Sequence, residues 1–552
     1  MIKLFVTLPY LIMVQACFRQ PPKNQNGPQR CLESGTCFKG SWDKTYHTLP
    51  YENYQGIRYA KPPTRYRRFR APEPYEYPNY GTVDVSGQAD KECPQLIPFL
   101  RIPKGQEDCL FMNIYVPEAA NYASLPVMVW FHGGAYLFGS GIKKEYGPQY
   151  FMDQNNVILV TVNYRLGPFG FLSLGSNTVP GNAGLRDQIL ALKWIRTHIS
   201  SFGGNPDSVT IFGESAGAHS VGMHILSPKS RGLFHRGIMQ SKSPLGPSFM
   251  ANEPRVAVNY GQTFTERLNC DQKTNVLNCL QSKSVDDILG QNYMIKDNLN
   301  IWMPVADGNF THDPILPESP DVLLKRGQFD PNIDVIIGTN KDEGLLTFAP
   351  QILLPFTWSK TRRNFATQFP MRIFSIPHPS EITPQVYEKT LKVIDFYIGS
   401  VQNINSQHLK GLVDMATDSA FLYGTYRTVQ YFQKSGMKVY QYLLSYEGEY
   451  SFTQDVGVSP RGVSHGDDIF YFWKRPGKRL NFRDSQVQNL MTSAWTHFAT
   501  FGQPFSEKSK VQWRPVTHKD QRFLNISGVY PTMEENAGIN NRMTFWDSIV
   551  DF

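Results

Sequence analysis

The stretch IFGESAGAH, residues 211–219, holds Ser215 between two glycines. The apolar run SVTIF leads into it, and the small residues AGAHSVGMHIL within and after it can open a helix. A strand, a sharp turn and a helix in this order form the context that exposes a serine as a nucleophile. Gly213 and Gly217 have no side chains, so they let the strand and the helix pack closely around the turn. The stretch therefore predicts a nucleophilic Ser215 rather than a serine in an ordinary turn.

The remainder of the chain alternates between apolar strand candidates and helical patterns. Near-continuous apolar runs are typical of strands covered on both faces, and we expect such strands at 125–131, 156–164, 208–212, 333–338 and 438–446. Between the second and third of these, apolar residues recur on one face of a helix, at Leu185, Ile189, Leu192, Ile195 and Ile199. This order predicts an α/β fold with a large, mostly parallel central sheet and helices on both faces. Ligands bind such sheets at the carboxyl ends of the strands.

Two long regions, 244–332 and 345–438, do not follow the alternation of strands and helices. We interpret them as helical insertions that cover the active site, because long segments between the elements of an enzyme commonly serve that purpose.

The composition, 41% hydrophobic and 18% charged, is that of a folded soluble protein. The net charge of +8 is small for 552 residues. The densest basic run, RYRRFR at 65–70, is interpreted as a solvated loop rather than a polyanion site. No nucleic-acid partner is therefore expected, and the sequence leaves the oligomeric state open.

The N-terminus carries a lysine, a short apolar stretch and then small residues, which predicts a signal peptide over residues 1–16. The alternative, a lipid attached to Cys17, matches its own recognition pattern poorly. No later stretch is long and apolar enough to span a membrane, so we expect a secreted protein with one domain over 17–552. In that compartment the sequons at Asn309 and Asn525 are expected glycosylation sites.

An export signal also permits disulfide bonds between the chain's cysteines. Cys93 and Cys109 are close in sequence, as are Cys270 and Cys279, and both are plausible pairs. Spacing alone leaves the connectivity open. No Cys-x-x-Cys pair occurs, which argues against a zinc or redox site.

A serine hydroxyl needs a base, and the base needs an orienting acid. His465 lies in the polar loop GVSHGDD, whereas His219 and His224 follow Ser215 on a helix and are interpreted as packing or surface residues. The acid is expected between serine and histidine in the chain, where NKDEG follows a predicted strand and offers Asp342 or Glu343.

A tetrahedral intermediate needs donors for its oxygen. WFHGGAYLFGS, residues 130–140, follows the predicted strand at 125–131. The backbone N–H groups of Gly133, Gly134 and Ala135 are unobstructed by large side chains, which suits an oxyanion hole.

At these residues the chain resembles the type-B carboxylesterases, the α/β-hydrolase group that also holds the cholinesterases, and most of all their secreted insect members. FGGNPDSVTIFGESAG at 202–217 matches the family's serine signature. EDCLFMNIYVP at 107–117 matches its cysteine signature, with Met112 where a smaller aliphatic residue is more usual. The resemblance runs from GIRYAKPP at 56–63 to FWDS at 545–548 and so covers nearly the whole chain.

The resemblance implies a role for each candidate residue. Ser215 matches the nucleophile, Glu343 rather than Asp342 matches the acid, and His465 matches the base. The implied oxyanion donors are the N–H groups of Gly134, Ala135 and Ala216. The implied disulfides are Cys93–Cys109 and Cys270–Cys279, while Cys31 and Cys37 are additional and either pair with each other or remain free.

The function expected from this resemblance is hydrolysis of a small-molecule carboxylic ester through an acyl-enzyme, with neither a metal nor an organic cofactor. Two alternatives are a slow protein that sequesters esters or organophosphates and a non-catalytic adhesion-type relative. A cholinesterase is disfavoured, because the loop between Cys93 and Cys109 lacks the tryptophan of the family's choline site. Glu214 disfavours an insect hormone esterase, which often has Gln there. It is not the expected acid, and we expect it to brace the site from behind.

Overall fold

The computed structural model describes residues 27–550, apart from 88–89, 99, 122, 247–252, 272–274, 295–300, 375, 377, 456, 459–461 and 536. The predicted signal peptide at 1–16 and Cys17 lie outside the described residues.

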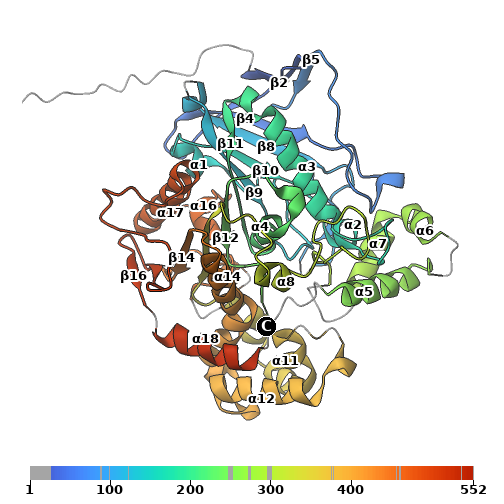
Figure 1. Cartoon of the computed structure of the whole chain (residues 1–552), viewed down its shortest axis with the longest axis vertical. Coiled ribbons are helices and arrows are strands. Elements are labelled where there is room, and N and C mark those ends of the chain that lie inside the picture. Colours follow the sequence, from blue (N-terminus) through green and yellow to red (C-terminus); the bar gives the residue numbers. More distant parts are fainter. Residues whose placement is uncertain are drawn as a thin grey trace, which may run out of the picture.

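An 11-stranded sheet forms the centre of the fold (Figure 1). In spatial order its strands are β16 (Thr532–Glu534), β15 (Phe523–Ile526), β14 (Val439–Leu444), β13 (Asp334–Asn340), β12 (Arg236–Gln240), β11 (Gly204–Glu214), β9 (Leu125–Phe131), β10 (Ile158–Val162), β8 (Phe111–Pro117), β4 (Pro50–Arg58) and β3 (Ser41–Lys44). The strands from β15 to β10 pair in parallel, while β16, β8, β4 and β3 are antiparallel to their neighbours. The predicted mostly parallel sheet is confirmed, with antiparallel strands at both edges.

Two small sheets flank the central one. One contains β1 (Gln29–Cys31), β2 (Thr36–Lys39) and β5 (Gly81–Asp84), and the other contains β6 (Gln95–Leu96) and β7 (Pro103–Lys104).

The α-helices alternate with the strands in the first half of the chain and follow one another in the insertions. They are α1 (Gln149–Asp153), α2 (Gly167–Phe171), α3 (Ala183–His198), α4 (Ala216–Leu226), α5 (Pro254–Arg267), α6 (Val276–Ser282), α7 (Val285–Met294), α8 (Pro320–Lys325), α9 (Leu345–Leu353), α10 (Thr357–Arg363), α11 (Phe365–Ile373), α12 (Pro384–Ile398), α13 (Leu409–Thr417), α14 (Tyr423–Lys434), α15 (Phe452–Asp455), α16 (Ile469–Phe472), α17 (Phe482–Phe501) and α18 (Ala537–Ile549).

Both faces of the sheet are covered, which explains why its central strands lack a polar face. All seven residues of β9 are buried. Successive side chains of a strand point to opposite faces, so Val127 and Val129 pack in one core with α3, α4 and α14. Met128 and Trp130 pack in the other core with α1, α16 and α17.

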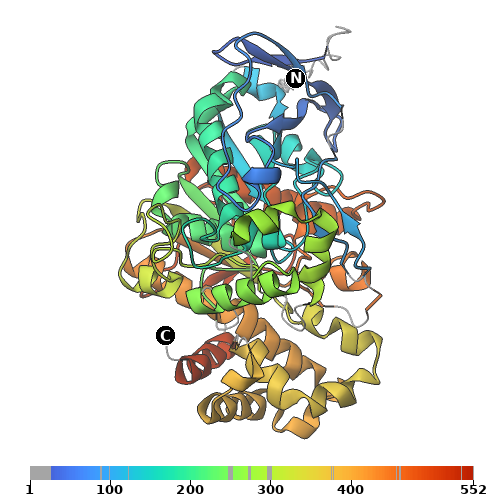
Figure 2. The same cartoon turned by 90° about the vertical axis from the view of Figure 1, so that its right-hand side faces the viewer.

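The predicted insertions are helical. The first contains α5 to α8, and the second contains α9 to α14. Helices α9 to α13 share a separate apolar core with α18 near the C-terminus. In both views α11, α12 and α18 lie together at one end of the molecule, opposite the small N-terminal sheet (Figures 1 and 2).

Three disulfides cross-link the chain. They join Cys93 to Cys109, Cys270 to Cys279 and Cys31 to Cys37. None of the helices formed by the described residues has the length and apolar character needed to cross a bilayer.

Candidate active site

Ser215 occupies the single residue between β11 and α4. Its backbone angles, φ 55° and ψ −121°, lie in a region that residues other than glycine rarely adopt. Two hydrogen bonds hold the turn: the Ser215 amide donates to the Gln240 carbonyl at 2.9 Å, and the Ser215 carbonyl accepts from the His219 amide at 2.9 Å. The surrounding backbone therefore stabilises a strained residue at the end of a central strand.

The two glycines of the turn are required for backbone packing. A Cβ atom on Gly217 would lie 1.9 Å from the carbonyl oxygen of Phe131 in β9. A Cβ atom on Gly213 would lie 2.5 Å from the carbonyl carbon of Gly217. Because both collisions involve backbone, no rotamer change can relieve them.

Three distant segments bring Ser215, His465 and Glu343 together. Glu343 follows β13, and His465 lies in the segment between α15 and α16. The Ser215 Oγ lies 2.8 Å from the His465 Nε2, and the His465 Nδ1 lies 2.7 Å from the Glu343 Oε2. The other Glu343 oxygen accepts from the Asn340 amide at 2.8 Å, and the carboxylate is fully buried.

Composition alone allowed either Asp342 or Glu343 to orient the histidine, and the structure gives the two carboxylates different partners. The Asp342 carboxylate accepts from the Val463 amide at 3.1 Å and so supports the histidine loop. Glu343 is the one that contacts the imidazole of His465.

Glu214 is a second carboxylate beside the imidazole. Its Oε1 lies 3.3 Å from the Nε2 of His465, the nitrogen that also faces Ser215. We expected Glu214 to brace the site from behind. Its carboxylate lies closer than that, because it reaches the imidazole of His465 itself. Burial raises the pKa of Glu214 to about 8. Burial lowers the pKa of His465, but the carboxylates of Glu214 and Glu343 outweigh this and raise it to about 9.

The glycine loop after β9 passes directly beside the nucleophile. A Cβ atom on Gly133 would lie 3.2 Å from the Cβ of Ser215 and 2.6 Å from the Oε2 of Glu214. Gly134 and Ala135 have positive φ angles of 104° and 54°. Ala216 is the first residue of α4, where backbone N–H groups lack partners within the helix. The three expected oxyanion donors thus belong to the two segments adjoining Ser215.

Sequence reasoning missed a buried lysine near this site. Lys242 comes shortly after β12, and its Nζ donates to the Ala420 carbonyl at 2.6 Å. The Nζ also lies 4.2 Å from the ring centroid of Phe421, and that ring lies 4.6 Å from the ring of His465. Ala420 and Phe421 belong to a π-helical turn at Asp418–Leu422, a feature that is frequent at functional sites. The sequence carried no signal for it, because Lys242 follows the polar residues Gln240 and Ser241 and not an apolar run.

The other histidines near Ser215 are structural. The His219 Nδ1 lies 2.8 Å from the Tyr136 hydroxyl, and the His224 Nε2 lies 2.7 Å from the Gln188 amide oxygen. Both rings are buried, so they are packing residues and not surface residues.

The sequons differ in their surroundings. Asn309 is exposed in a turn, whereas Asn525 lies in β15 with its amide nitrogen donating to Glu534 at 3.0 Å. Glycosylation of either stays a prediction, and the exposed Asn309 is the better acceptor. Within the described residues, no group of His, Cys, Asp and Glu side chains could hold a metal ion.

Comparison with known proteins identifies the family. The model of the carboxylesterase family matches residues 33–546. A juvenile hormone esterase from Tribolium castaneum is 33% identical over 545 residues, covering 92% of this chain and 91% of that protein. Esterase FE4 from Myzus persicae is 34% identical, covering 89% of this chain and 87% of that protein.

A solved structure has the same fold. The juvenile hormone esterase from Manduca sexta, crystallised with OTFP covalently attached, superposes with a TM-score of 0.83 at 28% identity, covering 94% of this chain and 99% of that one. The chain therefore belongs to the carboxylesterase family, as a carboxylic ester hydrolase with the α/β-hydrolase fold.

Proposed function

We propose that the protein hydrolyses small or medium-sized carboxylic esters, of xenobiotic, lipid or hormone type, with Ser215, His465 and Glu343 as its catalytic triad. The observation that carries the proposal is the continuous contact from the Ser215 Oγ through the His465 imidazole to the buried Glu343 carboxylate. A serine in hydrogen-bond contact with a base, which is itself oriented by an acid, is the arrangement that nucleophilic catalysis requires.

The first half of the reaction forms an acyl-enzyme. The Ser215 Oγ attacks the ester carbonyl carbon while its proton moves to the Nε2 of His465. Glu343 accepts the Nδ1–H and stabilises the positive charge on the ring. The carbonyl oxygen becomes negative and is bound by the backbone N–H groups of Gly134, Ala135 and Ala216.

The intermediate collapses when His465 returns the proton to the leaving alcohol. In the second half, His465 removes a proton from water, which attacks the acyl carbon and releases the carboxylic acid. His465 then donates that proton to the Ser215 Oγ, which regenerates the hydroxyl and leaves the imidazole neutral.

The proposed substrate class is broader than the substrate that the name of any one relative indicates. Relatives named juvenile hormone esterase support hormone esters as candidates, while those named esterase FE4 and carboxylic ester hydrolase support general esters. An acetylcholinesterase from Electrophorus electricus is 31% identical. However, the loop closed by Cys93 and Cys109 contains no tryptophan to face a quaternary ammonium, so choline esters are disfavoured.

The test is turnover of p-nitrophenyl esters with a series of acyl chain lengths. We expect the wild-type protein to release p-nitrophenol continuously and Ser215→Ala to lose at least about 10³-fold in kcat, without a change in thermal unfolding. Ser201→Ala, a serine outside the site, is the matched control and should retain wild-type activity. An organophosphate should label the wild-type and control proteins but not Ser215→Ala.

Two results would overturn parts of this proposal. Equal turnover in wild type and Ser215→Ala would remove Ser215 from the mechanism. A single burst of p-nitrophenol without further turnover would instead identify a sequestering protein that is acylated once.

We also propose that the protein is exported with residues 1–16 removed. The three disulfides support an oxidising compartment. A relative named venom carboxylesterase-6, from Apis mellifera, is 33% identical over 93% of this chain. N-terminal sequencing of protein from the culture medium should begin at Cys17, and retention of an intact Met1 inside the cell would contradict the proposal.

A further inference from the structure

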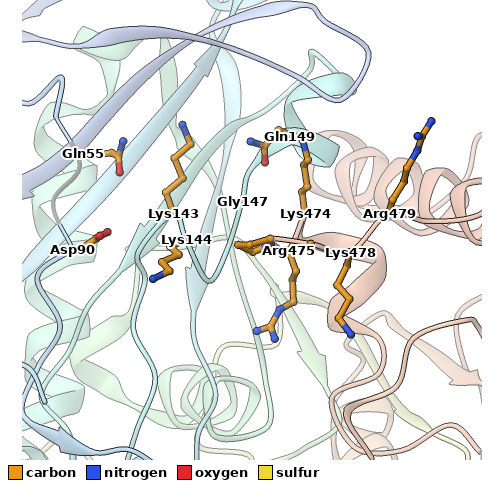
Figure 3. Close-up of a pocket in the computed structure, with 12 residues that line it drawn as sticks. Gln55, Asp90, Lys143, Lys144, Gly147, Gln149, Lys474, Arg475, Lys478 and Arg479 are labelled. Carbon is orange, nitrogen blue, oxygen red and sulfur yellow. The ribbon is translucent and has the colours of Figure 1, made fainter. Parts of the chain in front are cut away.

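A basic cavity lies between two loops, and none of its lining residues belongs to the Ser215 site. Its volume is about 510 Å³. One wall comes from the loop and helix start at 143–149, the other from the loop at 474–479, and Gln55 and Asp90 close one side. Figure 3 shows Lys143 and Lys144 on one side of the cavity and Lys474, Arg475 and Lys478 across from them.

The cavity has a strong excess of positive charge. Its cationic lining residues are Lys143, Lys144, Lys474, Arg475, Lys478 and Arg479, and Asp90 is the one carboxylate among the described residues that line it. Lys143 is also ion-paired with Asp43, which lies outside the lining. The charge of Arg475 also acts on two carboxylates outside the lining, lowering the pKa of Glu145 and of Glu214. Even with Lys143 and Arg475 set aside, the remaining cations outnumber Asp90. Positive charge of this density in a concave surface concentrates anions from solution.

The two loops are fixed to each other through their backbones. The Lys474 amide donates to the Gly147 carbonyl at 3.2 Å, and the two residues form an antiparallel bridge. A Cβ atom on Gly147 would lie 2.5 Å from the Lys474 carbonyl oxygen, so a side chain there would force the loops apart. The backbones of the two walls are therefore held at a fixed separation.

Two of the cations lie over the faces of aromatic rings. The guanidinium of Arg475 lies 5.2 Å from the ring centroid of Phe452, and the Nζ of Lys478 lies 4.7 Å from that of Tyr450. A ring face orients a cation without cancelling its charge. The Nε of Arg475 is buried and has no hydrogen-bond partner among the described residues. A buried donor of this kind normally has a partner.

The lining points to a particular class of ligand. Arginine and several lysines around one cavity suit a group with two negative charges and several acceptor oxygens, such as sulfate or phosphate. A single carboxylate would leave most of the cations unmatched. The buried Gln55, 6% exposed, adds a neutral amide of the kind that binds sugar hydroxyls. A cavity of about 510 Å³ has room for a molecule of sugar size.

We propose that this cavity binds a small sugar-like molecule that carries sulfate or phosphate groups. Sulfate and phosphate groups are both tetrahedral oxyanions, so one probe molecule is used for each of the two classes. Sucrose octasulfate represents the sulfated class and inositol hexakisphosphate represents the phosphorylated class.

The experiment is titration calorimetry of the full-length mature protein with each probe. The test variant is Lys144→Gln/Lys474→Gln/Lys478→Gln, which removes three cavity cations that the triad does not contact. The matched control is Lys193→Gln/Lys360→Gln/Lys434→Gln, which removes the same charge from exposed positions elsewhere. Thermal unfolding and p-nitrophenyl ester turnover establish that both variants are folded.

We expect the test variant to bind the preferred probe at least about tenfold more weakly than wild type, with the control within about twofold of wild type. Tighter binding of sucrose octasulfate identifies the sulfated class, and tighter binding of inositol hexakisphosphate identifies the phosphorylated class. Equal weakening in both variants would overturn the proposal in favour of non-specific attraction to net charge. Failure of wild type to bind either probe would overturn it outright.

Discussion

Replacing Glu214 with glutamine should move the pH dependence of ester hydrolysis in a defined direction. The substitution keeps the shape of the side chain and removes its negative charge. Two unit charges at the 3.3 Å that separates the Glu214 Oε1 from the His465 Nε2 interact by about 5 kcal/mol at an effective dielectric of about 20. At about 1.4 kcal/mol per unit, that sets an upper bound of between three and four pKa units.

The observable shift should be smaller than this bound. Burial raises the pKa of Glu214 to about 8, so the carboxyl group is protonated for much of the time near neutral pH. We therefore expect Glu214→Gln to lower the pKa of His465 by about one to two units. The base must be neutral to accept the Ser215 proton, so activity rises as pH passes through the pKa of His465. The acidic limb of the kcat/KM profile should accordingly move to lower pH.

The assay is the kcat/KM profile for a p-nitrophenyl ester at constant ionic strength. Glu145→Gln is the matched control, because burial also raises the pKa of Glu145, and the charges acting on it do not include His465. The control should leave the acidic limb in place. An acidic limb that stays fixed or moves to higher pH in Glu214→Gln would refute the reasoning, since the carboxylate could not then be the group that raises the pKa of His465.

Two further predictions concern the lysine near the site and the glycines of the turn. The charge of Lys242 lowers the pKa of His465, so Lys242→Met should move the acidic limb to higher pH by up to about one unit; a shift to lower pH in the same kinetic assay would contradict this. Gly217→Ala should cost about 1–3 kcal/mol of unfolding free energy in urea, because its Cβ would collide with the backbone of Phe131. Gly290→Ala lies in α7, where no described atom outside the helix's own backbone is within 4 Å of the added Cβ. It should be neutral or stabilising by up to about 1 kcal/mol, and equal losses in the two glycine variants would refute the packing argument.

The strands that could be predicted are those with a continuous apolar run. β9 was predicted at its observed bounds, because Leu125–Phe131 is buried on both faces and ends at glycines. β12 was not predicted, since its sequence RGIMQ begins with an arginine and a glycine and holds only two apolar residues in succession. Its strand character comes from pairing in parallel with β11 and β13, which is tertiary information.

The residues of the candidate site likewise fall into those that local sequence can locate and those that only the tertiary fold can locate. Motifs could locate Ser215 and His465, because each depends on local chain geometry. The choice between Asp342 and Glu343 rested on the resemblance, since both carboxylates occupy one loop and only the fold determines which one faces the imidazole. Lys242 could not be found, because a lysine in a sequence is ordinarily a surface residue.

The contact between Ser215 and His465 spans 250 positions of the chain, and it also constrains how the protein is made. At a synthesis rate of about 5–20 residues per second, roughly 12–50 s separate the appearance of the serine from that of the histidine. During this interval the nascent chain contains Glu214, and later Glu343, without the imidazole that balances them. Closing the core around Glu343 before His465 arrives would bury a carboxylate that lacks its imidazole partner, which costs free energy. Acquisition of esterase activity should therefore be among the last events of folding, later than formation of the central parallel strands.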